Sequence, residues 1–280
     1  MTRQTDEDAM PFKSILCAYS GDPARGSGLR HALKLARHHG AHLTGVHRHG
    51  VSPLRNQYGA QLPASLRAEL DKVDAAHLAE VAASFDAAVE AAGLSEQAEF
   101  VELDPVEDGP LAVFAHAFDI VVTGVHSDAT NEALLAAHPD MLALRSGRPV
   151  LVVPNGYEAD GLADRAIVAW DGKRSAARAL GDAMDVLAEK THVTLLSVGA
   201  PPRGTERMVR NMERHGVNVD AVSVPRDGRI ARTLLGYADA EGAKLIVMGA
   251  FEHSKFNHDL FGGVTTDVIA DAGVPVLMAH

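Results

Sequence analysis

Lys244–His280 reads KLIVMGAFEHSKFNHDLFGGVTTDVIADAGVPVLMAH, and this stretch carries most of the functional information in the chain. Its apolar run Leu245–Met248 ends at Gly249, which predicts a buried strand followed by a sharp backbone turn. GGVTT at 262–266 predicts a helix start, and PVLMA at 275–279 predicts a closing strand. Backbone N–H groups at a helix start lack intrahelical partners and attract anions, so the loop predicts a phosphate site.

The two halves of the chain repeat one pattern. SILCAYSGDPARGSGLRHALKLARHHG in the first half corresponds to RAIVAWDGKRSAARALGDAMDVLAEK in the second, and Ile15–Gly21 aligns without a gap to Ala166–Gly172. The halves also close alike, because FDIVVTGVHS and SGRPVLVVP are echoed by AKLIVMGAFEHS and AGVPVLMAH. The chain is therefore predicted to be a tandem duplication.

Short β-branched runs alternate with amphipathic segments in both halves. Strands are predicted near 13–19, 41–47, 97–103, 119–124, 149–153, 165–170, 192–198, 218–224, 244–249 and 275–279. Helices are predicted near 26–39, 64–92, 108–117, 131–146, 174–189, 205–215, 228–241 and 263–272. This alternation predicts an α/β fold of two tandem doubly wound, Rossmann-like domains, each a five-stranded mostly parallel sheet flanked by helices.

Turn-forming residues mark the predicted domain boundaries. Residues 1–12 are expected to be a disordered lead-in, and 13–154 to form the first domain. NGYEADGLAD at 155–164 has the composition of a linker, and 165–280 forms the second domain.

The pattern MGA…HS…GGVT…PVL resembles the C-terminal signature of the universal stress proteins. Nucleotide-binding members of that family carry Gly-x2-Gly-x9-Gly-Ser/Thr, whose glycines and hydroxyl hold the phosphates of ATP. Gly249 and Gly262 match the first and third glycines. Glu252 stands at the second glycine and Gly263 at the Ser/Thr, while Thr265 still offers a hydroxyl. The resemblance implies an adenine nucleotide such as ATP as ligand, and the two departures argue for weak or absent binding.

The resemblance covers nearly the whole chain and also implies where the ligand lies. In the family, adenine and ribose lie against the first strand-helix turn, where an Asp makes a polar contact, and Asp171 matches that position in the second half. Asp171 has the alternative role of bonding turn amides. In the first half Ser20 replaces it and no glycine pair follows Gly124, so that copy is predicted to be degenerate. The implied site consists of Asp171, Ser197, Val198, Gly249, Ser254, Gly262, Gly263 and Thr265.

Composition excludes several classes of function. The formal charge of −11 argues against broad nucleic-acid affinity, and no apolar run approaches the roughly 18–20 residues that span a bilayer. The N-terminus lacks the apolar region of a signal peptide, so a cytoplasmic location is expected. The single cysteine, Cys17, is predicted to be a buried structural thiol.

Fifteen histidines are present, and several cluster near the first helix and second strand. Zinc requires three or four convergent ligands, and no HExxH or paired-cysteine spacing supplies them. A solvated histidine-rich surface is therefore predicted and no metal site is assigned, although His47 and His49 would share one strand face and leave adventitious metal binding open. The clustered residues are His38, His39, His42, His47 and His49.

Two further segments have alternative interpretations. The long helix at 64–92 carries apolar residues at helical spacing, which favours a core-facing stripe over a domain cover or an oligomer contact. This stripe consists of Leu66, Leu70, Val73, His77, Val81 and Phe85. The basic stretch Arg203–Arg214 also contains Glu206 and Glu213, which favours a solvated helix face over a partner surface.

Three functional hypotheses follow. The first is a regulatory or protective stress protein that binds an adenine nucleotide through its second half and an unidentified protein partner. The second is an interaction scaffold with two inactive pockets, and the third an enzyme that hydrolyses or transfers from ATP, for which no catalytic residue is assigned. The resemblance also implies pairing of the last strands, Val150–Val153 and Val276–Met278, as an internal pseudo-dimer, with association of whole chains as a further alternative.

Overall fold

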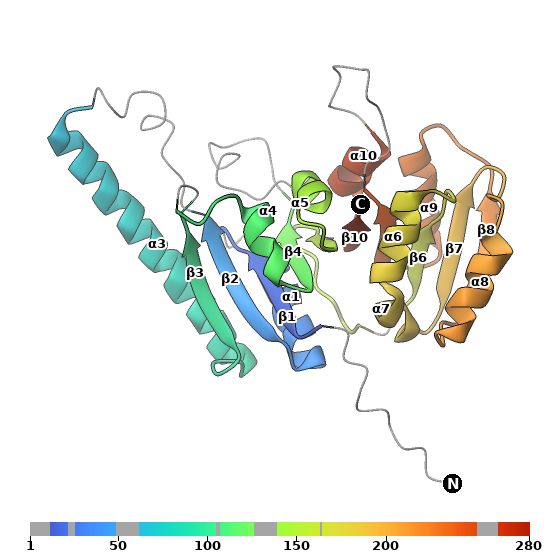
Figure 1. Ribbon diagram of the computed structural model, residues 1–280, viewed down its shortest axis with the longest axis horizontal. Coiled ribbons are helices and arrows are strands. Elements are labelled where there is room, and N and C mark those ends of the chain that lie inside the picture. Colours follow the sequence, from blue (N-terminus) through green and yellow to red (C-terminus); the bar gives the residue numbers. More distant parts are fainter. Residues whose placement is uncertain are drawn as a thin grey trace, which may run out of the picture.

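The computed structural model describes residues 12–21, 26–48, 62–104, 107–125, 139–162, 164–250 and 263–280. Strands and helices alternate along the chain in two successive series (Figure 1). The first series is β1 (Ser14–Ala18), α1 (Ser27–His39), β2 (His42–Arg48), α3 (Ala64–Ala92), β3 (Ala98–Leu103), α4 (Leu111–Phe114), the 3-10 helix η2 (Ala115–Ala117), β4 (Ile120–Gly124), α5 (Pro139–Arg145) and β5 (Val150–Val153). The second is β6 (Ala166–Ala169), α6 (Arg174–Asp182), α7 (Met184–Ala188), β7 (Val193–Val198), α8 (Thr205–Arg214), β8 (Val219–Val224), α9 (Ile230–Ala240), β9 (Leu245–Gly249), α10 (Val264–Asp271) and β10 (Val276–Ala279).

One continuous sheet runs through both repeats in the order β3-β2-β1-β4-β5-β10-β9-β6-β7-β8. Strand pairs within each repeat are parallel, for example β1 with β2 and β6 with β7. The repeats join where β5 and β10 pair antiparallel, with Leu151 opposite Leu277 and Val152 opposite Val276. The α/β fold with two doubly wound halves is confirmed, as is the expected pairing of the two last strands.

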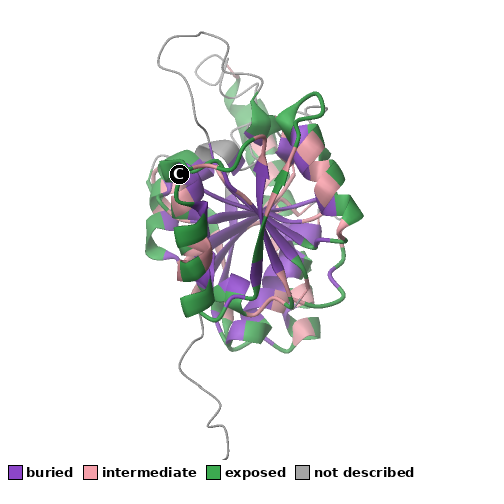
Figure 2. Ribbon diagram, turned by 90° about the vertical axis from the view of Figure 1, so that its right-hand side faces the viewer, coloured by how far each residue is buried: buried purple, intermediate pink, exposed green. Residues whose placement is uncertain are grey.

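Side chains alternate along each strand, so every strand presents side chains to both faces of the sheet. Both faces are apolar, and helices cover both of them. On one face Ile15 and Cys17 pack beneath helices that include α1, α3, α6, α7 and α8. On the other face Leu16 and Ile167 pack against helices that include α4, α5, α9 and α10. Each apolar cluster contains residues of both repeats, and Figure 2 shows the buried strands in the middle with exposed surfaces outside.

Every predicted strand is present, with its ends within one residue of the expected positions. Three helices differ. The segment expected at 174–189 is split into α6 and α7 at Ala183, where ψ is −2°. The segment expected at 108–117 starts only after Pro110, whose preceding Gly109 has φ of 78°. Of the helix predicted at 131–146, the described part is α5, and residues 131–138 lie outside the described residues.

The long helix α3 packs on the sheet only through its C-terminal half. Its buried residues are Val81, Phe85 and Val89, whereas Leu66 and Val73 are 45% and 64% exposed. The predicted core-facing stripe over the full helix is therefore wrong for the N-terminal half, which extends beyond the sheet (Figure 1).

Among the described residues, no helix combines the length and the apolarity needed to cross a bilayer.

Phe85 lies directly on the backbone of β2. A Cβ atom at Gly45 would lie 2.3 Å from the Phe85 ring, so only glycine leaves room for the ring at this distance.

The prediction for Cys17 is confirmed, because this thiol is fully buried and its burial raises its pKa to about 12.

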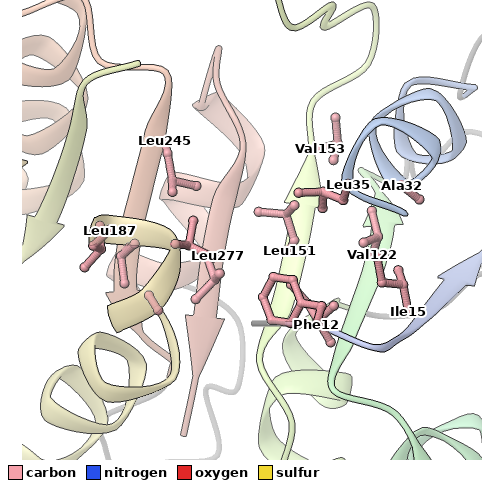
Figure 3. Packing of buried hydrophobic residues seen from close by; sticks show 14 of the residues in the cluster. Phe12, Ile15, Ala32, Leu35, Val122, Leu151, Val153, Leu187, Leu245 and Leu277 are labelled. Atoms are coloured by element: carbon pink, nitrogen blue, oxygen red, sulfur yellow. The ribbon is translucent and has the colours of Figure 1, made fainter. Parts of the chain in front are cut away.

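The boundary between the two repeats, called the seam below, is formed by β5, β10 and the helices α1 and α7 beside them. Leu151 and Leu277 face each other across the two strands, with Phe12 packed nearby (Figure 3). Phe12 is 4% exposed, so it belongs to the core although the sequence assigned it to the lead-in. Residues 1–11 lie outside the described residues.

The predicted linker at 155–164 is held against the seam from both sides. The ammonium group of Lys34 in α1 donates a hydrogen bond to the Ala159 carbonyl, and that of Lys190 after α7 donates to the Leu162 carbonyl. Tyr157 packs on His31, with ring centroids 6.0 Å apart. Each repeat therefore contributes one lysine that fixes the linker.

His31 lies in this region and is 8% exposed. Its pKa is lowered to about 4, first by burial and then by the positive charges of Lys190 and Lys34. Folded protein therefore keeps His31 neutral at pH values where the unfolded chain, with a pKa near 6.5, is protonated.

We predict that Gly45→Ala lowers the free energy of unfolding by about 1–3 kcal/mol, because the added methyl group overlaps the Phe85 ring. The matched control is Gly236→Ala in α9, where no atom lies within 4 Å of the added Cβ. This control should raise stability by about 0.5–1 kcal/mol through helix propensity. Urea unfolding measures both, and equal effects of the two changes would contradict the packing described for Gly45.

We also predict that stability falls as the pH decreases from 6.5 towards 4, because the unfolded state then binds a proton that folded His31 does not. His31→Gln removes this contribution, so its unfolding free energy should lose about 2 kcal/mol less between pH 7 and pH 5 than that of the wild type. Urea titrations at both pH values measure the difference. His42→Gln, at an exposed histidine, is the control that should follow the wild type.

Candidate functional site

Three of the predicted site residues of the second repeat lie where its strand order reverses. β6 pairs with β7 on one side and with β9 on the other, and the chain crosses from one side to the other between β8 and β9. Asp171, Val198 and Gly249 stand at the carboxyl ends of these three strands. In doubly wound sheets, ligands bind in the crevice outside such carboxyl ends.

Gly249 lies against the first turn of α6. A Cβ atom at this position would be 2.5 Å from the Ser175 hydroxyl and 2.6 Å from the Ala176 backbone nitrogen. The absence of a side chain therefore brings the α6 N-terminus next to the end of β9. The first repeat repeats this close approach, since a Cβ at Gly28 in α1 would lie 3.0 Å from the Gly124 nitrogen at the end of β4.

Asp171 is half-exposed and already engaged with its own turn. Its Oδ1 accepts a hydrogen bond of 3.0 Å from the Lys173 backbone N–H, and its Oδ2 lies 3.7 Å from the Lys173 ammonium nitrogen. The turn-bonding role considered from the sequence is thus present. The carboxylate remains reachable from solvent, because half of the side chain is exposed.

Ser197 and Val198 have different surroundings. The Ser197 hydroxyl is buried and donates a 3.0 Å hydrogen bond to the Trp170 carbonyl, so it holds the ends of β6 and β7 together. Val198 is half-buried at the end of β7. Val198 is therefore the more exposed of the two side chains.

The described part of the glycine-rich loop begins at Gly263, which precedes α10. Gly263 has extended backbone, with φ of −137°, and provides no side-chain cap for the helix. Thr265 is buried within the first turn of α10. Glu252, Ser254 and Gly262 lie outside the described residues.

A wide groove adjoins the site on the side of β7 and β8, with a volume of about 910 Å³. Thr205 at the start of α8 connects this groove to the site: its hydroxyl accepts a 3.1 Å hydrogen bond from the Trp170 ring N–H and donates to the Pro202 carbonyl at 2.7 Å. Trp170 was not predicted as a site residue, although its place directly before Asp171 was a usable signal. The lining residues are Ser197, Pro201, Pro202, Arg203, Gly204, Thr205, Glu206, Arg207, Arg210, Ala221, Val222 and Ser223.

The basic stretch in this groove is solvated, as predicted. Arg203, Arg207 and Arg210 are exposed, and the Arg210 guanidinium lies 4.0 Å from the Glu206 carboxylate, one helical turn earlier. The groove therefore carries positive charge at the edge of an acidic protein.

The histidines near α1 and β2 do not form a uniformly solvated surface. His39 and His47 are buried, so the prediction is wrong for these two residues. His47 Nδ1 lies 3.2 Å from the Tyr19 carbonyl oxygen, and His39 packs edge-on against Phe12. His38 and His42 are exposed, and His49 lies outside the described residues.

Comparisons with known proteins identify the same fold. The sequence model described as the universal stress protein family matches residues 11–154 and 205–280. A universal stress protein from Archaeoglobus fulgidus DSM 4304 is 19% identical, covers 95% of this chain and 96% of its own, and superposes with a TM-score of 0.70. A putative universal stress protein from Pseudomonas aeruginosa UCBPP-PA14 is 17% identical, with coverages of 97% and 95% and a TM-score of 0.55. No curated protein sequence matches significantly.

We predict that Gly249→Ala lowers the free energy of unfolding by about 1–3 kcal/mol, because the new methyl group overlaps backbone atoms of α6. Gly263→Ser is the matched change in the same loop, where no atom lies within 4 Å of the added Cβ. It should leave stability unchanged or raise it by about 0.5 kcal/mol, since serine caps a helix N-terminus. Thermal and urea unfolding compare the two, and a tolerated Gly249→Ala would contradict the close approach.

Proposed function

The chain belongs to the universal stress protein family, and from this premise we propose that it is a regulatory or protective binding module whose second repeat takes an adenine nucleotide. The ligand lies at the carboxyl ends of β6, β7 and β9. A cytoplasmic location and an unidentified protein partner are part of the proposal. Catalysis is not part of the proposal.

The observation that supports this proposal most directly is the close approach of α6 to Gly249. The Ala176 nitrogen lies in the first turn of α6, where backbone N–H groups have no intrahelical acceptor. No side chain caps this helix start. Partial positive charge at the helix N-terminus therefore lies next to the end of β9, where the family's first phosphate-loop glycine is expected.

Asp171 is the proposed partner of the ribose. Its half-exposed carboxylate lies at the end of β6, and carboxylate oxygens accept hydrogen bonds from ligand hydroxyl groups. The ion pair with the Lys173 side chain is long and solvated, so exchanging it for a ligand hydroxyl costs little.

The two departures from the family motif set the expected affinity. A carboxylate at Glu252 repels phosphate, and Gly263 lacks the hydroxyl of Ser/Thr. We therefore propose weak nucleotide binding by the native sequence. The interaction scaffold is the second candidate, and it is favoured by these same two residues.

The test begins with native mass spectrometry of freshly purified protein and identification of any released small molecule. Calorimetry with ATP and magnesium then compares the wild type with Glu252→Gly and with Glu252→Gly combined with Gly263→Ser. We expect each step to tighten ATP binding, by about tenfold for removal of the carboxylate. Unchanged ATP affinity in both variants would refute the explanation that Glu252 and Gly263 weaken binding. If neither the wild type nor either variant binds ATP, the interaction scaffold is favoured.

Asp171→Ala tests the site itself. Loss of one hydrogen bond to a charged group should weaken ATP binding about tenfold in the Glu252→Gly background, where binding is measurable. Asp239→Ala, at an exposed position near the end of α9, is the control and should leave the dissociation constant unchanged. Equal affinities in these two variants would place the nucleotide elsewhere.

A further inference from the structure

We propose that His38, His39 and Glu189 form a binding site for a divalent metal ion, suited to Zn²⁺, at the seam between the two repeats. The site is separate from the proposed nucleotide site and does not depend on it. His38 and His39 are the last two residues of α1, and Glu189 caps the C-terminus of α7. Two histidines and one carboxylate are a common set of protein ligands for zinc.

The geometry of the three side chains fits one ion. One ligand atom from each residue lies within 4.8 Å of the other two, and His38 Nε2 is hydrogen-bonded to Glu189 Oε2 at 2.9 Å. Zinc–ligand distances of about 2.0–2.2 Å place tetrahedral ligand atoms about 3.3–3.5 Å apart. Small side-chain rotations therefore convert the observed cluster into a coordination site.

The cluster combines a fixed side with an open side. His39 is 2% exposed, and its ring lies edge-on to Phe12 and to His38, with centroid distances of 5.1 Å and 4.7 Å. His38 and Glu189 have side-chain exposures of 45% and 32%, so an ion can enter from solvent. Water can complete the coordination on that side, as in zinc sites with three protein ligands.

Glu189 is the one anionic group among the described charged or ionisable groups that act on His39. The charged or ionisable groups that act on His39 are Glu189, His38, Lys190 and Lys13. Lys190 directs its ammonium group to the Leu162 carbonyl of the linker, so it is held by another partner. Glu189 is the anionic ligand that offsets the ion's positive charge.

The duplication explains why these residues meet. Ile15 pairs with Leu43 in the first repeat, and the equivalent Ala166 pairs with Val193 in the second. His39 and Glu189 each lie four residues before those equivalent positions. Antiparallel pairing of β5 and β10 relates the repeats by an approximate twofold rotation, which brings the equivalent helix ends together across the seam. An ion at this site would therefore link the two repeats.

The experiment uses the full chain and Zn²⁺ alone, without nucleotide. After chelator treatment and removal of the chelator, calorimetry and metal analysis after dialysis measure affinity and stoichiometry. We expect one tightly bound zinc ion per chain and a rise in melting temperature with added zinc, because an ion that binds only the folded state stabilises it. Co²⁺ in place of Zn²⁺ should give the visible absorption of a tetrahedral site.

Variants assign the ligands. His38→Ala and Glu189→Gln change partly exposed residues, so they are expected to fold, and their melting without zinc checks this. Each should weaken zinc binding about tenfold or more, because one of three ligands is lost. Glu158→Gln, a carboxylate of the linker, and His215→Ala, an exposed histidine after α8, are the matched controls and should bind like the wild type.

Two outcomes would overturn the proposal. Zinc binding that survives unchanged in both His38→Ala and Glu189→Gln would place the ion among other histidines. Absence of binding at millimolar Zn²⁺ would show that the cluster is only a hydrogen-bonded contact of the seam. Neither outcome bears on nucleotide binding, which is measured separately.

Discussion

The antiparallel pairing of β5 with β10 is the interaction on which the rest of the structure depends. Each repeat alone would end in an apolar strand, VLVV or VLMA, with unpaired backbone groups along one edge. An exposed apolar edge strand is a template for aggregation. Pairing the two strands covers both exposed edges and produces one sheet, with apolar clusters that run through both repeats. It also determines which helices meet, since α1 and α7 flank the same junction.

Much of the fold could be predicted from the sequence because its strands are short β-branched runs with sharp ends. The helices were less predictable, since their limits depend on single backbone positions such as Ala183 and Pro110. The apolar spacing of α3 continues past the end of the sheet that it covers. Periodicity therefore overestimated its buried stripe, and only contacts such as Phe85 on Gly45 show where packing stops.

In the candidate site, a residue could be predicted from the sequence only where its immediate backbone surroundings require that residue type. Gly249 is an example, because a strand end that touches a helix start tolerates no side chain. Ser197 was assigned to the ligand from its position, yet its hydroxyl bonds the Trp170 carbonyl, a contact that depends on the register of β6 and β7. The contact of Glu189 with His38 joins residues 151 positions apart, and local sequence holds no sign of it. Such contacts follow from topology.

The seam also shows what fusion of two copies permits. In a dimer of identical chains, residues that lie near the twofold axis face their own copies, so an acid there would face an acid and a histidine would face a histidine. Here the equivalent positions hold His39 and Glu189, which differ in charge and in donor atoms. Covalent linkage allowed each copy to mutate alone, and the interface could become chemically complementary. The broken symmetry is thus a property that no homodimer of either half could acquire by point mutation.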